Sequence, residues 1–150
     1  MTKSSVMDAE ADASKILRII DANLNRLREA LRVIDEYFRF MSLDEPLART
    51  LKLLRHSLEQ IEADFGAARL VASRDIETDP FASVNKPEET GRSTPRQLLL
   101  ANFKRSQEAS RVIEEYAKLG RKVAASGTAK ALRFSLYNLE KDIMERHTHE

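Results

Sequence analysis

The chain has 150 residues and a mass of 17.1 kDa, with 42% hydrophobic and 33% charged residues but only four glycines and four prolines. This length suits one domain and excludes a multidomain enzyme, and the scarcity of turn residues argues against an all-β fold. The net charge of +1 excludes a strong general field for nucleic acid or an anionic membrane. Without cysteine, the sequence excludes disulfides and thiolate zinc sites. Without a long apolar segment or a signal peptide pattern, it predicts a cytoplasmic protein.

The first part of the chain is predicted to form a helical hairpin, residues 13–65, behind a flexible arm of residues 1–12. Asp12 or Ser14 is the expected N-cap of its first helix. From there apolar residues recur at three- and four-residue steps as far as Met41. This spacing is typical of a long amphipathic helix.

A second helix is expected after Ser42, which can cap it, with Pro46 in its first turn and its end near Asp64. The segment that follows, 66–94, has no sustained period and holds two of the four prolines and two of the four glycines. We expect it to form a long crossover connection, with one helical turn near residues 67–71.

The last part, residues 95–146, is predicted to form a second helical hairpin. Its first helix is expected to run from Thr94 or Pro95 to Leu119, with Gly120 as its stop. Its second helix is expected to follow Ser126 and Gly127.

An internal repeat is the most informative feature of the sequence. The segment ANLNRLREALRVIDEYFRF at 22–40 returns as ANFKRSQEASRVIEEYAKL at 101–119, identical at ten of nineteen positions. In the same way RHSLEQIE at 55–62 returns as RFSLYNLE at 133–140. The offsets of 79 and 78 positions indicate a duplicated αα-hairpin. The predicted fold class is therefore all-α, a four-helix bundle of two tandem hairpins joined by the long crossover.

The repeat places polar residues on an otherwise apolar helix face. On a helical wheel, Asn23 and Arg26 lie at the N-terminal end of a stripe of core residue types, and Asn102 and Arg105 repeat this arrangement. Burying a guanidinium group without a partner is costly. The pattern therefore predicts that both arginines are buried or line a pocket, facing either a polar network or an anionic ligand.

Acidic residues flank this face and concentrate in the crossover. Glu29 and Glu108 lie beside the stripe at equivalent positions, where salt bridges that only orient the hairpins are the alternative to a ligand site. In the crossover, Arg74, Asp75 and Asp79 could bring carboxylates to a magnesium ion and a cation to a phosphate, or form a solvated acidic loop. The glycines form no phosphate-binding loop, so any nucleotide must be held by side chains and helix N-termini.

These motifs resemble a known family. The stretches ILRIIDANLNRLREALRVIDEYFRF, LKLLRHSLEQIE, LVASRDIETD and LLLANFKRSQEASRVIEEYAKL follow one another over residues 16–119. They are similar to the small helical domain at the N-terminus of many bacterial thiamine-phosphate synthases, also called the alternative hydroxymethylpyrimidine-phosphate kinase domain. After Asp79 the sequence departs from the Gly-containing pattern of that family. Because the chain ends at Glu150, without room for the βα-barrel synthase, we expect a stand-alone version that does not itself make thiamine phosphate.

The resemblance implies a role in thiamine biosynthesis, in which the protein binds or phosphorylates hydroxymethylpyrimidine phosphate, a phosphorylated pyrimidine, with ATP and Mg²⁺. The residues assigned to metal binding or proton transfer in catalysis are Asp75, Asp79, Glu29 and Glu108. The residues assigned to substrate binding are Asn23, Arg26, Arg74, Asn102, Lys104 and Arg105.

Two other functions fit the same pattern. The first is a non-catalytic module that partners a separate thiamine-phosphate synthase or forms a homo-oligomer. The second is another helical enzyme of anionic metabolites, of which the arginine-lined chorismate mutases are the type.

Overall fold

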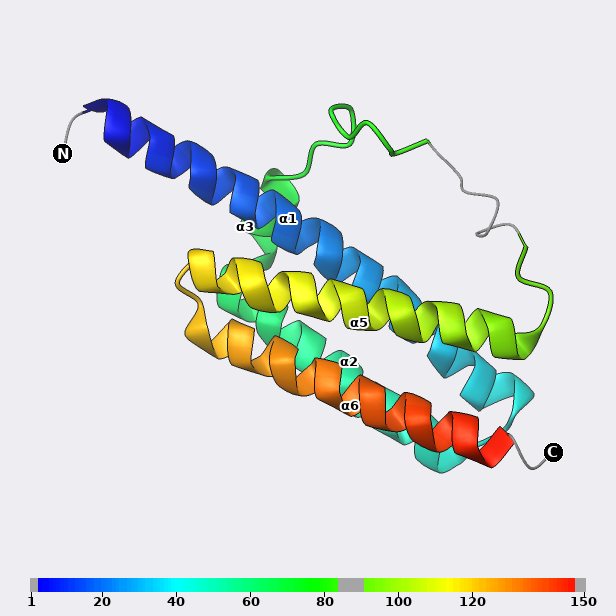
Figure 1. Cartoon of the computed structure of the whole chain (residues 1–150). Coiled ribbons are helices and arrows are strands. Elements are labelled where there is room, and N and C mark those ends of the chain that lie inside the picture. The colour runs from blue at the N-terminus through cyan, green and yellow to red at the C-terminus, as the bar shows by residue number, and fades with distance from the viewer. Residues whose placement is uncertain (1–2, 84–90, 148–150) are drawn as a thin grey trace.

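The computed structural model describes residues 3–83 and 91–147, and these form helices without any strand (Figure 1). The all-α class is therefore confirmed. Within this part of the chain no helix combines the length and apolarity that crossing a bilayer needs. The helices are α1 (Lys3–Glu36), a π-helical continuation of it (Tyr37–Met41), α2 (Glu45–Phe65), α3 (Ala67–Ala72), α5 (Pro95–Leu119) and α6 (Val123–His147).

The four long helices pack side by side as a bundle. α1 packs most extensively against α5, α5 packs against α6, and α2 contacts both α1 and α6. Figure 1 shows that α1 and α5 run in opposite directions, a point that the sequence left open. The chain leaves α2 through the short α3 and crosses to the opposite end of the bundle, where α5 begins. Superposition of the two hairpins about a two-fold axis stays a prediction.

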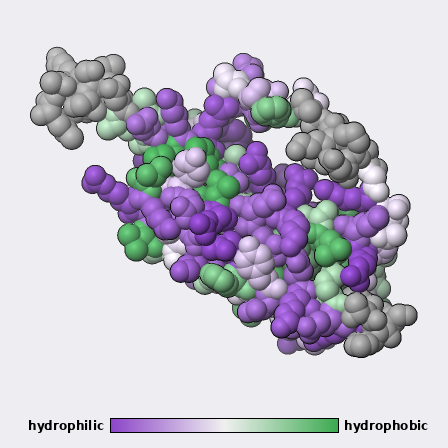
Figure 2. Space-filling view, viewed as in Figure 1, coloured by the Kyte–Doolittle hydropathy of each residue, from purple (hydrophilic) through white to green (hydrophobic). Residues whose placement is uncertain are grey.

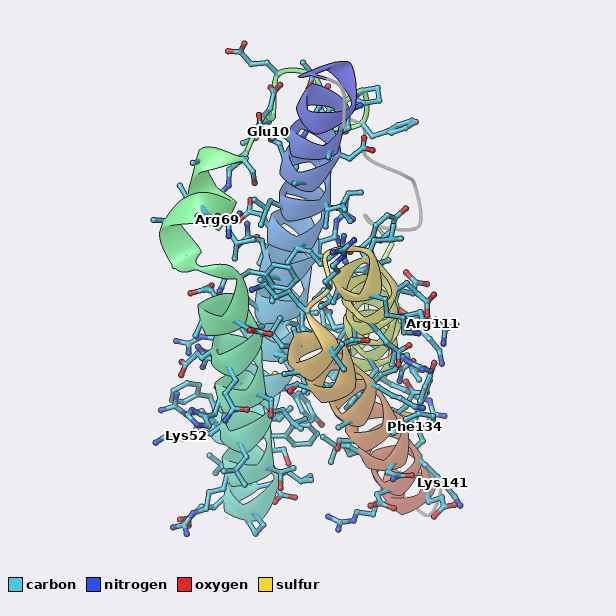
Figure 3. The ribbon with its side chains drawn as sticks, turned by 90° about the vertical axis from the view of Figure 1, so that its left-hand side faces the viewer. Glu10, Lys52, Arg69, Arg111, Phe134 and Lys141 are labelled. Carbon is cyan, nitrogen blue, oxygen red and sulfur yellow. The ribbon has the colours of Figure 1, made fainter. Side chains whose placement is uncertain are left out.

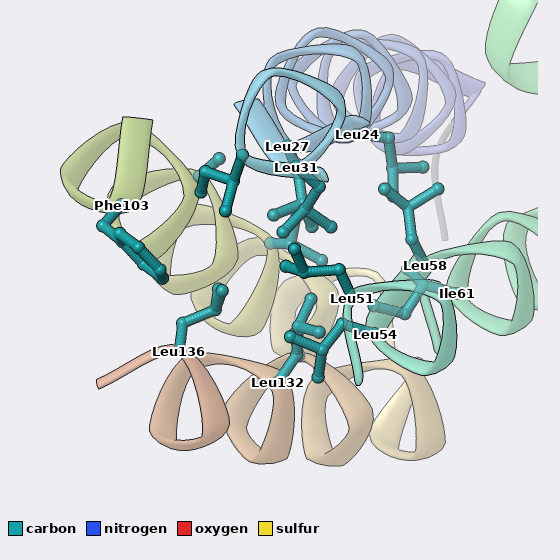
Figure 4. Packing of buried hydrophobic residues seen from close by; sticks show 14 of the residues in the cluster. Leu24, Leu27, Leu31, Leu51, Leu54, Leu58, Ile61, Phe103, Leu132 and Leu136 are labelled. Carbon is teal, nitrogen blue, oxygen red and sulfur yellow. The ribbon is translucent and has the colours of Figure 1, made fainter. Parts of the chain in front are cut away.

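The apolar stripes of the four long helices meet in one core (Figure 4). Leu31 of α1, Leu51 of α2, Phe103 of α5 and Leu136 of α6 are completely buried in it. Burial of such side chains, about 1.5–3 kcal/mol each, is the main force that holds helices together. Because every long helix contributes, the bundle as a whole supplies the core that a single hairpin lacks.

α2 is capped by a different residue from the one predicted. Asp44 is the N-cap, and its Oδ1 accepts a hydrogen bond from the Leu47 N–H at 3.1 Å. Ser42 instead ends the π-helix, where its N–H donates to the carbonyl of Tyr37 at 2.9 Å. The turn between them passes through Leu43 at a φ of 54°.

The boundaries of α5 are as predicted. Thr94 is the N-cap, and its hydroxyl accepts a hydrogen bond from the Gln97 N–H at 3.2 Å. Gly120 follows the last residue of the helix. The helical turn expected near residues 67–71 is also confirmed, as α3.

α1 begins much earlier than predicted. It starts at Lys3, so the predicted loose arm is helical over residues 3–12, and neither Asp12 nor Ser14 is an N-cap. The residues concerned include alanines and Glu10, which are strong helix formers. They extend the helix even though they lack the apolar period on which the prediction relied.

α6 also begins earlier than predicted, at Val123. The Ala125 N–H near its start donates to Oδ2 of Asp64 in α2 at 3.2 Å, so another helix supplies the cap. Ser126 lies inside the helix, where its hydroxyl donates to the Glu114 carbonyl at 2.9 Å. Gly127 is likewise a helical residue rather than a turn.

Candidate anion-binding site

The two asparagines predicted for the site are buried in equivalent positions. Asn23 Nδ2 donates to the Ile19 carbonyl at 2.9 Å, and Asn102 Nδ2 donates to the Leu98 carbonyl at 2.8 Å. Each amide nitrogen is thus bound to its own helix. In α1 the remaining oxygen, Asn23 Oδ1, accepts a hydrogen bond from Arg26 Nη1 at 3.4 Å and so helps to position that guanidinium group.

A pocket of about 400 Å³ lies between α1 and α5. Arg26 and Arg105 come from equivalent positions of the two repeats, and Arg92 comes from the segment before α5. Of the two arrangements expected for Arg26 and Arg105, buried or pocket-lining, the structure has the second, because their long side chains reach solvent at the outer edge of the helix pair. We call this the three-arginine pocket; it is lined by Asn23, Arg26, Arg92, Arg105, Glu108, Ala109 and Val112.

The three-arginine pocket carries an excess of positive charge. Among the described residues, none forms an ion pair with Arg26, Arg92 or Arg105, whereas Arg74 and Arg133 each hold a buried carboxylate. One carboxylate, that of Glu108, lines the pocket beside the three guanidinium groups. Planar guanidinium groups match the geometry of phosphate oxygens and form their strongest hydrogen bonds with such anions. The arrangement therefore suits a small anion with at least two negative charges.

Arg74 anchors the crossover instead of lining this pocket. Its Nε and Nη2 donate to the two carboxylate oxygens of Asp21 at 2.9 and 3.0 Å, and Asp21 is only 6% exposed. The hydrogen bond to Asp21, with the charge of that carboxylate, raises the pKa of Arg74 above its usual value. The geometry thus gives Arg74 a carboxylate partner within the chain, and its role in binding phosphate stays a prediction.

The acidic residues of the crossover accept hydrogen bonds from other residues of the same loop. The carboxylate of Asp75 accepts hydrogen bonds from the N–H and the hydroxyl of Thr78 at 3.2 and 2.9 Å, and Asp79 Oδ1 accepts from the Phe81 N–H at 2.9 Å. Both aspartates are exposed. In the ranges 3–83 and 91–147, no three acidic or histidine side chains are grouped to hold a metal ion. These carboxylates thus accept hydrogen bonds from within the loop, and a role for them in binding metal stays a prediction.

The turn at Asp75 gives a testable pH dependence. The hydroxyl and N–H of Thr78 hold the pKa of Asp75 below its ordinary value of 3.8. A lowered pKa means that the turn is stabilised above pH 3.8 and loses this stabilisation as the pH falls through the folded value. In an NMR titration we expect the Thr78 amide signal to shift with a midpoint below 3.8, and Thr78→Val to raise that midpoint. A wild-type midpoint at or above 3.8 would contradict this geometry.

Lys104 and Glu29 also lie outside the three-arginine pocket. Lys104 Nζ lies 3.1 Å from Glu140 Oε1 and so faces α6. Glu29 is exposed and does not line the pocket, although its repeat equivalent Glu108 does. Of the predicted site residues the pocket brings together Asn23, Arg26, Arg105 and Glu108, and it leaves out Glu29, Arg74, Asp75, Asp79, Asn102 and Lys104.

Sequence reasoning missed Arg92. It belongs to the crossover, outside the repeat, and no periodicity marks it. From the sequence, Arg92 could be placed only near the start of a predicted helix, two residues before Thr94. The sequence did not indicate which residues of α1 it would lie beside. Arg92 lines the pocket because the segment before α5 lies beside residues of α1 and α5 at this point.

Comparison with known proteins identifies the family. The thiamine-phosphate synthase of Thermosynechococcus vestitus is 44% identical over 131 residues, which cover 87% of this chain and 36% of that protein. The thiamine-phosphate synthases of Nostoc punctiforme and Gloeobacter violaceus are 39% and 41% identical and cover 90% and 88% of this chain. The chain spans only 37% of the length of each of these two relatives. No solved structure matches it significantly. The model of the ThiD2 family matches residues 18–142, and the chain belongs to this family.

Proposed function

We propose that the chain serves thiamine biosynthesis in the cytoplasm by binding hydroxymethylpyrimidine phosphate in the three-arginine pocket. One observation carries this proposal: three guanidinium groups, none in an ion pair with another described residue, line a space of about 400 Å³. That volume lies in the range of small-ligand sites. The similarity to thiamine-phosphate synthases supports the pathway, and the charge of the pocket supports a phosphorylated ligand.

Different residues of the pocket would bind different parts of the ligand. Arg26 and Arg105, on opposite walls, would bind the phosphate oxygens, with Asn23 holding the Arg26 guanidinium group in place. Ala109 and Val112 would supply an apolar wall for the pyrimidine ring. A phosphate held by guanidinium groups from both repeats would also explain why the repeat carries an arginine in each copy, Arg26 and Arg105.

The proposal extends to phosphoryl transfer from ATP. The γ-phosphoryl group would pass to an oxygen of the bound phosphate as its bond to ADP breaks, giving hydroxymethylpyrimidine diphosphate and ADP. Among the described residues, no cluster of three acidic or histidine side chains is present that would hold a magnesium ion by protein groups alone. Mg²⁺ would instead enter with the nucleotide, which needs only one or two protein carboxylates, and Glu108 is placed to be one.

Turnover by two variants tests this assignment. With hydroxymethylpyrimidine phosphate, ATP and magnesium, wild-type protein should form the diphosphate, detected by ³¹P NMR. Glu108→Gln should lower turnover by about a hundredfold, because it removes the carboxylate of the pocket. Asp75→Asn is the matched control, since Asp75 already binds Thr78 and lies outside the pocket. Loss of turnover in Asp75→Asn but not in Glu108→Gln would assign catalysis to the crossover loop instead.

A non-catalytic module that partners thiamine-phosphate synthase is the second candidate. The observation in its favour is coverage: in the Thermosynechococcus vestitus synthase the matching region makes up 36% of a longer chain. A region that is one part of a longer chain in these relatives has surfaces that can contact the rest of a synthase. Co-sedimentation with purified thiamine-phosphate synthase, together with undetectable turnover, would favour this function over the kinase.

A further inference from the structure

α1 extends past one end of the bundle. α1 has 34 residues and α5 has 25. The end of α5 lies beside Ile16, since a Cβ placed on Gly120 would be 3.6 Å from Cγ2 of Ile16. Residues 3–15, which we call the overhang, therefore project beyond α5 by about 20 Å at 1.5 Å per residue. Residues 9–15 are exposed. A helical segment of this length gains little stability without a packing partner.

A groove lies between the overhang and the end of the bundle. Its volume is about 760 Å³, and apolar side chains, including those of Ile16, Phe65 and Tyr116, form much of its lining. Leu119 in the groove and Val123 beside it are 67% and 81% exposed. Figure 2 shows hydrophobic side chains gathered at this end of the molecule, with hydrophilic ones around them. Large exposed apolar patches with a polar rim are typical of interaction sites.

The charges around this end groove are complementary to those of the overhang. The overhang itself supplies Asp12 and Lys15 to the lining of the groove, and the basic side chains that the bundle supplies are Arg69, Arg121 and Lys122. In the part of the chain that the structure describes, none of them forms an ion pair, and neither do Glu10 and Asp12 of the overhang. Figure 3 shows Glu10 and Arg69 at the same end of the molecule. One surface thus carries unpaired groups of both signs around an apolar centre.

We propose that this end of the molecule is a homodimer interface, in which the overhang of each copy fills the end groove of the other. The two overhangs would run antiparallel, and the small side chains of Ala9 and Ala13 would allow their close approach. Glu10 and Asp12 of one copy would pair with Arg69 and Arg121 of the other. A two-fold axis makes every such contact twice, so the interface is self-complementary.

Charge exchange tests the dimer directly. In sedimentation velocity, wild-type protein should be a dimer. Glu10→Lys/Asp12→Lys and Arg69→Glu/Arg121→Glu should each raise the dimer dissociation constant by about a hundredfold or more, because like charges then face each other. An equimolar mixture of the two variants should form a heterodimer, since every contact across the axis is again between opposite charges. Rescue on mixing is a result that neither an unfolded variant nor a small-ligand site would give.

Lys52→Glu is the matched control, because Lys52 is an exposed cation on α2, toward the other end of the molecule (Figure 3). It should leave the dimer unchanged. Circular dichroism should show native helicity for all variants, since the replaced side chains are exposed. A monomeric wild-type protein would overturn the proposal, and so would a dimer that survives both charge reversals. A monomer that inorganic pyrophosphate stabilises, through Arg69 and Arg121, would assign the groove to a small anion instead.

Discussion

Arg26→Ala/Arg105→Ala should weaken the binding of hydroxymethylpyrimidine phosphate by about a thousandfold, since each hydrogen bond between charged groups contributes about 1.5–3 kcal/mol. The protein should still fold, because both side chains are exposed and neither forms an ion pair with another described residue. Isothermal titration calorimetry measures the affinity, and thermal unfolding measures the stability. This combination separates a ligand site from a structural salt bridge, whose loss would lower the stability instead.

Arg49→Ala is the control for that variant. Arg49 is an exposed arginine whose ion pair is with Glu45 one helical turn away, on α2. Its removal should change neither ligand affinity nor stability by a measurable amount, as is usual for an exposed pair. If the Arg26→Ala/Arg105→Ala variant bound the ligand as tightly as Arg49→Ala, the three-arginine pocket would not be the binding site.

The second large effect concerns the core behind the pocket. Phe103→Ala should lower the free energy of unfolding by about 3–5 kcal/mol, because Phe103 is completely buried and its loss leaves a cavity. Phe103→Leu installs the residue that the first repeat has at Leu24, and it should cost less, about 1–2 kcal/mol. Urea unfolding followed by circular dichroism measures both. Equal costs for the two variants would show that the core does not pack around this side chain.

The fold was predictable where its determinants are local. The start of α5 at Thr94 or Pro95 and its stop at Gly120 were predicted correctly, because the residues that begin and end a helix act on their immediate neighbours. The start of α6 was not predictable in this way, since its first turn is capped by Asp64, which is distant in the sequence. The start of α1 was missed because helix-forming residues extend the helix toward the N-terminus, beyond the apolar residues that pack in the core.

The candidate site was predictable only in the part that repeats. Asn23 and Arg26 could be paired with Asn102 and Arg105 from the sequence, and both arginines line one pocket because α1 and α5 lie side by side. Arg92 lies outside the repeat. The path of the crossover places it at the pocket, and no local sequence pattern determines that path. The same reason explains Arg74, whose partner Asp21 lies 53 positions earlier.

The central claim is that the three-arginine pocket binds a phosphorylated pyrimidine, and one NMR measurement tests it most directly. On addition of hydroxymethylpyrimidine phosphate, the guanidinium Nε–H signals of Arg26, Arg92 and Arg105 should shift together and saturate at the same ligand concentration. The signal of Arg49 should stay in place. Unchanged signals for all three arginines, or shifts confined to Arg69 and Arg121 in the end groove, would contradict the assignment.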